Sequence, residues 1–366
     1  MPRTRIAVLF GGRSTEHQIS CVSASSVLAA LDRDRYDVVA IGITPEGRWV
    51  LGSDDPKALV AHDGVLPSVD GSGSAVALPG DPSAAGLVLL EPGDMPSAFG
   101  NVDVVFPILH GPFGEDGTIQ GLLELAGIPY VGSGVLASAV SMDKEFMKLL
   151  LAARGLPIGP YVVVRDADWS SDPDAALDAI DALEYPVFVK PARGGSSIGI
   201  SKVRRREDVS AAIELARNSD PKVIVERGLV GREIECAVLG GLHGAPADAS
   251  VPAEIHVGTG FDFYDFEAKY LADSTTFDIP ALLDNKTTDE VRRIAVQAFD
   301  ALDCSGLARV DFFITDDGLI VNEINTMPGF TPTSMYPRMW EASGVDYPAL
   351  VDRLVAIAIE AGTGLR

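Results

Sequence analysis

Two carboxylates, an amide and a guanidinium alternate with apolar residues in the stretch "ARVDFFITDDGLIVNEIN", residues 308–325. This pattern is typical of two strands, and a three-residue hairpin loop would place Asp311 opposite Glu323 and Arg309 opposite Asn325. Because side chains alternate along a strand, all four would share one face. Such oxygens suit Mg²⁺, so we predict a magnesium site on Asp311, Glu323 and Asn325. The alternative, a solvated polar face with an ion pair, leaves the apolar opposite face unexplained.

The glycine-rich stretch "VFVKPARGGSSIGISKV", residues 187–203, is a second candidate. A P-loop has its lysine after the glycines and a helix behind them, whereas here Lys190 comes first and a strand-like run follows. We therefore predict a β-hairpin. Its glycines would let the backbone approach a ligand, and Lys190 could neutralise a phosphate. From this stretch alone, a nucleotide-binding flap and an exposed hairpin tip with a solvated lysine are equally good interpretations.

Further acidic residues accompany the strand-like run "VIVE". Glu226 ends this run and Glu233 follows it. A carboxylate here could accept hydrogen bonds from the sugar of a nucleotide, and the backbone from Glu226 to Leu229 could bind an adenine edge. An exposed acidic loop is the alternative.

These candidates need a scaffold, and the sequence predicts an α/β protein. Strand-like runs at 3–12, 36–44 and 103–111 alternate with helical patterns at 14–31 and 117–127, which is typical of a parallel sheet. We predict surface loops over 52–100, with one strand at "GLVLLE". Expected boundaries near Ala139 and Ile234 divide the chain into three domains: 1–139, 140–233 and 234–366.

Composition excludes several classes of protein. The net charge of −23 over 366 residues argues against binding to nucleic acid or to anionic membranes. The three cysteines are far apart and lack CxxC spacing, so we predict neither a disulfide framework nor a zinc site. No apolar run approaches the ~18 residues of a membrane helix, and no signal-peptide pattern opens the chain. We expect a cytoplasmic protein.

Seven motifs in this order resemble the D-alanine–D-alanine ligase family of the ATP-grasp superfamily. They are "FGGRSTEHQIS", "HGPFGEDGTIQG", "MDK", "FVKPARGGSSIGI", "YDFEAKY", "ARVDFF" and "VNEINTMPGFTPTSMYP". The resemblance covers nearly the whole chain. It implies a three-domain ATP-grasp architecture with an N-terminal Rossmann-like substrate-binding domain, a central unit with the glycine flap, and a C-terminal unit with the magnesium and oxyanion sites.

The resemblance also implies the reaction. The carboxylate of one D-alanine would attack the γ-phosphate of ATP to form an acyl phosphate. The amine of a second D-alanine would then displace phosphate, giving the dipeptide for peptidoglycan precursors. ATP is the implied co-substrate and two Mg²⁺ ions the implied metals, with Mn²⁺ as a substitute. A homodimer is the implied assembly.

Roles for the substrate site follow residue by residue from the resemblance. Glu16 would bind the first ammonium and His110 would lie near the first carboxylate; an acid at a helix N-terminus and a structural histidine are the alternatives. Arg309 and the Gly329 N–H would form the oxyanion hole. The remaining assignments are Tyr270 of the mobile loop "YDFEAKY" in a network with Ser196 and Glu16, and Ser334 and Met335 at the second carboxylate.

The implied ATP site combines phosphate and adenosine contacts. Lys144 and Lys190 would neutralise phosphates, and Lys269 would reach the γ-phosphate. The full set of implied ATP-binding residues is Lys144, Lys190, Ser197, Glu226, Arg227, Leu229, Glu233, Lys269 and Phe313.

Three rival functions are compatible with parts of this sequence pattern. A D-alanine–D-lactate or D-alanine–D-serine ligase is the nearest, although Tyr270 favours D-alanine. Another ATP-grasp carboxylate–amine ligase is more distant, because the N-terminal motif is the most specific to this family. A non-catalytic nucleotide-sensing module would be expected to lack a lysine, a metal ligand or the oxyanion arginine, and all of these are present.

Overall fold

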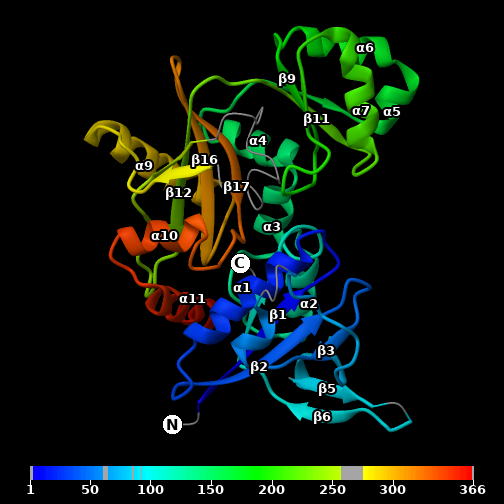
Figure 1. Ribbon diagram of the computed structural model, residues 1–366, viewed down its shortest axis with the longest axis vertical. Coiled ribbons are helices and arrows are strands. Elements are labelled where there is room, and N and C mark those ends of the chain that lie inside the picture. Colours follow the sequence, from blue (N-terminus) through cyan, green and yellow to red (C-terminus); the bar gives the residue numbers. More distant parts are fainter. Residues whose placement is uncertain (1–2, 61–64, 85, 92, 257–274, 365–366) are drawn as a thin grey trace.

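The computed structural model describes residues 3–60, 65–84, 86–91, 93–256 and 275–364. They form three β-sheets flanked by helices, an N-terminal, a central and a C-terminal sheet (Figure 1). This mixed α/β arrangement is the one that alternating strand and helix patterns predict. Across these ranges, no helix is both long enough and apolar enough to span a membrane.

The N-terminal sheet has seven strands in the order β6-β5-β4-β3-β2-β1-β7. The three predicted strands β1, β2 and β7 pair in parallel. Helices α1 and α2 pack on opposite faces of this part. The elements are β1 Thr4–Gly11, α1 His17–Ala30, β2 Tyr36–Ile43, β3 Trp49–Leu51, β4 Ala75–Ala77, β5 Leu87–Leu90, β6 Ser97–Gly100, β7 Val104–Ile108 and α2 Thr118–Ala126.

The prediction of surface loops over residues 52–100 was wrong in part. Strands β4, β5 and β6 lie within this range and, with β3 directly before it, extend the N-terminal sheet as an antiparallel edge; only β5 coincides with the one predicted strand. Each has three or four residues, and β3 and β4 each bury one side chain, Val50 and Val76. So short a run contains too few residues to display a period of two.

The central sheet has the order β10-β9-β11-β8. As predicted, β9 and β10 pair antiparallel and carry the glycine loop between them. Helices α5, α6 and α7 accompany this sheet at the upper right of Figure 1. The elements around it are α3 Val135–Met142, α4 Lys144–Ala153, β8 Tyr161–Val164, α5 Asp166–Ser171, α6 Pro173–Asp181, β9 Val187–Pro191, β10 Ser201–Val203, α7 Val209–Arg217 and β11 Val223–Arg227.

The C-terminal sheet has the order β15-β14-β12-β16-β17, with β13 also paired to β12. Helix α9 packs against one of its faces. The elements are β12 Arg232–Leu239, β13 Asp248–Ala249, β14 Ala253–His256, β15 Thr276–Asp278, α9 Asn285–Ala301, β16 Leu307–Thr315, β17 Gly318–Asn325, α10 Met335–Ala342 and α11 Tyr347–Ala361.

The hairpin of β16 and β17 has the predicted residue pairs, but its loop is shorter than predicted and it contains a bulge. Thr315 pairs with Gly318, so the loop has two residues and the predicted three-residue loop was wrong. A bulge then adds one residue on β17, because Phe312 pairs with Val321 while Asp311 pairs with Glu323. The bulge restores the register, and Asp311 opposite Glu323 and Arg309 opposite Asn325 are confirmed.

The last helix joins the two ends of the chain in one core. Leu350 and Leu354 of α11 are fully buried in the same cluster as Ile6 of β1 and Phe106 of β7. Asp352 on this helix also accepts hydrogen bonds from Tyr36 and Arg35. The N-terminal sheet therefore has one face covered by a segment from the opposite end of the chain.

Candidate active site

Two cavities adjoin where the three sheets meet. The first, of about 300 Å³, is lined by residues from all three parts of the chain. The second, of about 260 Å³, lies between the central and C-terminal sheets. Both are lined by Lys144, Gly194, Gly195, Ser196, Glu235, Arg309 and Glu323. The shared wall therefore carries the cations and carboxylates on which the sequence predictions centre.

The first cavity contains the predicted substrate residues. Glu16, just before α1, is 9% exposed and accepts a hydrogen bond from the Ser196 hydroxyl of the glycine loop. This contact joins segments 180 residues apart, as the predicted network requires. Ser334 and Met335 line the opposite wall, where Ser334 Oγ accepts from the backbone N–H of Thr331 at 3.1 Å.

His110 also lines this cavity, but both of its ring nitrogens are engaged. Nδ1 lies 3.0 Å from the carbonyl oxygen of Met327, and Nε2 lies 3.2 Å from the Ser23 hydroxyl. Since a carbonyl only accepts, Nδ1 carries the hydrogen and Nε2 accepts from Ser23. Burial lowers the pKa of His110, which keeps the ring neutral. These contacts fit the alternative in which His110 is a structural histidine.

The polar face of the β16–β17 hairpin forms the shared wall. Arg309 Nε and Nη2 each lie 2.7 Å from an oxygen of Asp311, and Nε lies 3.2 Å from Glu235 on β12. The Arg309 side chain is only 15% exposed, so a solvated ion pair does not describe this site. Burial lowers the pKa of Arg309, but its carboxylate partners raise it by more. The pKa therefore lies above its usual value, and the side chain stays protonated.

The donor set on this wall fits a hard cation. Asp311, Glu323 and Asn325 offer two carboxylates and an amide oxygen, and the Asn325 oxygen has one lone pair committed to the Met327 N–H at 3.0 Å. Elsewhere among the described residues, Glu254, His256 and Asp278 are close enough to share an ion. There Arg232 makes two hydrogen bonds to Glu254, as Arg309 does to Asp311.

The second cavity concentrates positive charge around a buried carboxylate. Lys190 and Lys148 lie 2.5 and 3.0 Å from the two oxygens of Glu226. Glu226 is 7% exposed, which rules out the exposed-loop alternative for this residue. Burial alone would raise the pKa of Glu226, but the two lysines hold it well below its usual range. The pair of lysines therefore stays fixed at the floor of the cavity.

The glycine loop contacts a third lysine that lines this cavity. Lys144, the first residue of α4, donates to the Gly194 carbonyl at 3.0 Å and lies 3.4 Å from Glu323. Ser196 and Ser197 have φ angles of 50° and 58°, a left-handed conformation that non-glycine residues rarely adopt. Such strain is concentrated at ligand-binding segments, which supports the flap interpretation.

Two known protein-family profiles match this chain. The profile of the D-ala D-ala ligase N-terminus matches residues 5–133, and that of the D-ala D-ala ligase C-terminus matches residues 150–356. The chain belongs to the D-alanine–D-alanine ligase family. The resemblance of the seven motifs is thereby confirmed.

Full-length relatives and solved structures agree with this assignment. The D-alanine–D-alanine ligases of Mycobacterium sp. (strain JLS) and Rhodococcus opacus (strain B4) are 59% and 60% identical over 370 residues, covering all of this chain and 98% and 99% of theirs. The D-alanine–D-alanine ligase from Coxiella burnetii has a TM-score of 0.81 at 37% identity, over 99% of this chain and 95% of that one. The VanG D-Ala:D-Ser ligase from Enterococcus faecalis has a TM-score of 0.83 at 36% identity, over 98% and 100%. The ATP-grasp architecture is confirmed.

The remaining ATP-site residues implied by the ligase family surround the second cavity, with the exception of Lys269. Those in its wall, besides Lys144, Lys190 and Glu226, are Ser197, Arg227, Leu229, Glu233 and Phe313. Gly329, of the implied oxyanion hole, lines the first cavity. Lys269 and Tyr270 lie outside the described residues, in the range 257–274.

Sequence reasoning missed three charged residues that line these ligase cavities. Lys148 follows Lys144 by one helical turn, and this i,i+4 spacing was the available signal. Glu235 lies on β12 directly opposite Asp311, a contact between distant segments that no local pattern reveals. Glu115 lies within the quoted motif "HGPFGEDGTIQG" and accepts from the N–H groups of Gly111 at 2.5 Å and Met327 at 3.1 Å.

The protonation of Glu115 makes the free energy of unfolding depend on pH. Burial and the nearby Glu16 raise its pKa from 4.5 to about 8, so the folded protein keeps a proton that the unfolded chain loses. The stabilising contribution is complete below pH 4.5 and is lost as the pH rises to 8, with a slope of up to about 1.4 kcal/mol per pH unit. We expect Glu115→Gln to flatten this slope in urea unfolding between pH 5 and 8.

The matched control for this measurement is the exposed Glu91, whose Gln variant should keep the wild-type slope. A Glu115→Gln protein with the same pH dependence as wild type would contradict the raised pKa.

Proposed function

We propose that this protein uses ATP to join two D-alanines into D-alanyl-D-alanine, the dipeptide of peptidoglycan precursors. The observation that carries the proposal is the shared wall of the two cavities. Lys144, Arg309 and Glu323 face both the space beside Glu16 and the space beside Lys190. A carboxylate held in the first cavity therefore meets a phosphate held in the second, as acyl-phosphate formation requires.

In the first step, the protein's role is positioning and charge stabilisation. Glu16 would hold the ammonium of the first D-alanine, and the neutral His110 would fix the loop at Met327 beside its carboxylate. Lys144 and Lys190 would neutralise phosphate oxygens of ATP. Mg²⁺ ions, or Mn²⁺ in their place, held by Asp311, Glu323 and Asn325, would supply further charge neutralisation at the phosphates.

In the second step, the amine of the second D-alanine attacks the acyl-phosphate carbonyl and phosphate leaves. Arg309 and the Gly329 N–H would stabilise the oxyanion that forms. Ser334 and the Met335 backbone would hold the second carboxylate on the opposite wall. The loop with Lys269 and Tyr270 would exclude water, which otherwise hydrolyses the acyl phosphate.

The organisation of the whole chain belongs to the same proposal. We assign one unit to each sheet, since the strands of the three sheets lie within 4–108, 161–227 and 232–325, and the second boundary leaves only the first two residues of β12 in the central unit. We also infer that the protein is cytoplasmic and that it forms a homodimer. The dimer is supported by the exposed Leu125, Leu136 and Leu149 on neighbouring helices. A mass measurement by light scattering tests the dimer. The proposed units are 1–139, 140–233 and 234–366.

The test of the reaction is phosphate release from ATP and Mg²⁺ with D-alanine, alongside L-alanine, D-serine and D-lactate, with product masses read for each. We expect release with D-alanine and the mass of the dipeptide. Faster ligation in mixtures with D-serine would move the assignment toward the activity named for the VanG relative. Release with none of the substrates would overturn the proposal.

Acceptor choice gives a separate prediction at Tyr270. Tyr270→Phe removes the hydroxyl that the proposal places in the network of Ser196 and Glu16. We expect D-lactate to compete about tenfold better against D-alanine as second substrate, because the lid then holds the acceptor less strictly. Product masses from equimolar mixtures measure the ratio. An acceptor profile identical to that of wild type would count against this role.

A further inference from the structure

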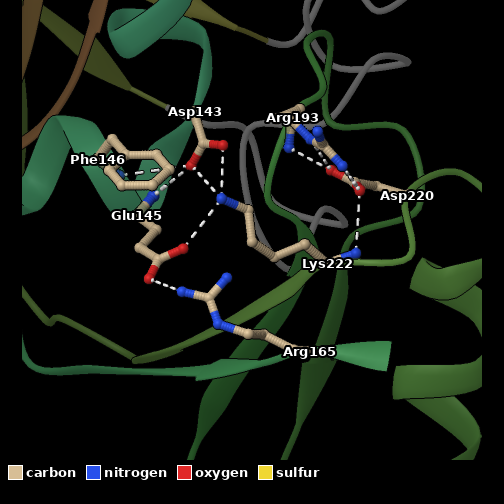
Figure 2. A network of polar contacts seen from close by, with 7 residues as sticks. All are labelled: Asp143, Glu145, Phe146, Arg165, Arg193, Asp220 and Lys222. Carbon is tan, nitrogen blue, oxygen red and sulfur yellow. Dashed lines mark hydrogen bonds and ion pairs between the residues drawn. The ribbon is translucent and has the colours of Figure 1, made fainter. Parts of the chain in front are cut away.

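A network of ion pairs, in which Asp143, Glu145, Asp220 and Lys222 are buried, adjoins the glycine loop at Arg193 and has no part in the site described so far (Figure 2). None of its seven residues lines either of the two cavities. The members come from helix α4, the strand β8 end, the glycine loop and the turn before β11. They are Asp143, Glu145, Phe146, Arg165, Arg193, Asp220 and Lys222.

Lys222 is the centre of one half of the network. Its ammonium lies 2.5 Å from Asp143 and 2.9 Å from Glu145, and 4.6 Å from the centre of the Phe146 ring. Lys222, Asp143 and Glu145 are each less than 10% exposed. Arg165 adds a further hydrogen bond to Glu145 at the surface.

Arg193 and Asp220 form the other half. Arg193 donates to Asp220 from Nε at 3.0 Å, from Nη2 at 2.6 Å and from its backbone N–H at 2.8 Å. Burial alone would raise the pKa of Asp220, but these bonds and the Lys222 N–H at 2.9 Å hold it below its usual value. Asp220 therefore stays ionised and ties the two halves together.

The network reaches the phosphate-binding groups through the backbone. Lys144 directly follows Asp143, and Gly194 directly follows Arg193. Asp143 and Arg193 form an isolated antiparallel bridge. The Lys144 N–H donates to Ala192 O at 3.0 Å, and the Ala192 N–H donates to Lys222 O at 2.9 Å. Three segments distant in sequence are thus held side by side.

We propose that Arg193, Asp220 and Lys222 are positioning residues that set the spacing between Lys144 and the glycine loop for the triphosphate of ATP. A fork-shaped guanidinium–carboxylate pair imposes a geometry that apolar packing of the same volume does not. The inference rests on the proposed assignment of Lys144 and the loop to ATP phosphates. It assigns these three residues an effect on phosphate binding without contact with the nucleotide.

The test is Arg193→Met, measured by calorimetric binding of a non-hydrolysable ATP analogue with Mg²⁺ and of AMP. The variant removes the cation that pairs with Asp220, which is 3% exposed, but the backbone N–H groups of Arg193 and Lys222 still donate to this carboxylate, and far-UV circular dichroism checks the fold before binding is measured. We expect about a tenfold loss of affinity for the triphosphate analogue and less than about a twofold change for AMP. Arg193→Lys, which keeps the charge, should recover part of the loss. Lys222 is left intact, because its removal would strand two buried carboxylates.

Arg205→Met is the matched control. Arg205 also makes two hydrogen bonds to one aspartate, Asp208, at 3.2 and 2.9 Å, but on the outer side of the central unit. It should bind the analogue like wild type. An equal loss for the analogue and for AMP in Arg193→Met would indicate general disruption and overturn the inference.

Lys144→Ala separates this inference from the proposed site. If Lys144→Ala weakens binding of the analogue and Arg193→Met does not, the positioning inference is wrong and the ATP site stands. If neither variant changes the affinity, the proposed phosphate site itself is wrong, and the inference falls with it.

Discussion

Glu323→Gln should reduce ligation about 10³-fold or more while the protein remains folded. The substitution keeps the shape of the side chain and removes one of the two carboxylates that we assign to the metal. Glu323 is 31% exposed and forms an ion pair with Lys144 at 3.4 Å, so little packing is lost. The loss of stability should be within about 1 kcal/mol.

The measurement is dipeptide formation over a Mg²⁺ titration, together with thermal unfolding. Asp317→Asn is the matched control, because Asp317 is an exposed carboxylate in the turn of the same hairpin. It should keep wild-type turnover. Unchanged turnover of Glu323→Gln at ordinary Mg²⁺ would contradict the metal assignment. Recovery of turnover at high Mg²⁺ would support it.

Arg309→Lys should lower the rate of dipeptide formation by about 10²–10³-fold. A lysine keeps the charge that buried Glu235 and Asp311 require, but it cannot donate the two parallel hydrogen bonds that Arg309 makes to Asp311. The ammonium would therefore point less accurately at the oxyanion. Because the oxyanion forms only in the second step, ADP formation in a single turnover should fall by much less.

Quenched single-turnover reactions, with ADP and dipeptide both quantified, distinguish the two steps. Arg232→Lys is the control, since Arg232 also makes two hydrogen bonds to one carboxylate, Glu254, on the same sheet. If ADP and dipeptide formation fall equally in Arg309→Lys, the residue acts before the second step and the oxyanion role is wrong.

Local patterns predicted the parts of this fold that short-range physics determines. Alternating apolar residues identified β1, β2 and β7, and the glycine-rich run identified the β9–β10 hairpin. The Asp311–Glu323 pairing was predicted correctly although the loop length was not, because the bulge on β17 compensated for the missing loop residue. The bulge coincides with two consecutive polar residues, Asn322 and Glu323, between the buried Val321 and Ile324.

Contacts between distant segments could not be predicted from the sequence alone. Glu235 meets Arg309 because β12 pairs with β16, and Lys222 meets Asp143 across 79 residues. Lys222, Asp143 and Glu145 look like solvated charges in the sequence, since buried lysines and acids are rare unless paired. The edge strands of three or four residues likewise depend on the neighbouring strand, and not on their own composition, to form.

The packing of α11 on the N-terminal sheet has a consequence for synthesis on the ribosome. Strands β1 and β7 are made early, yet Leu350 and Leu354 complete their core from the last helix. β7 ends at Ile108 and α11 begins at Tyr347, so more than 200 residues must be translated in between. At ~5–20 residues per second this takes roughly 10–50 s, during which α1 already packs on this sheet face but the part that α11 covers stays exposed in the nascent chain. Chaperones thus have a defined window in which to bind this part of the face.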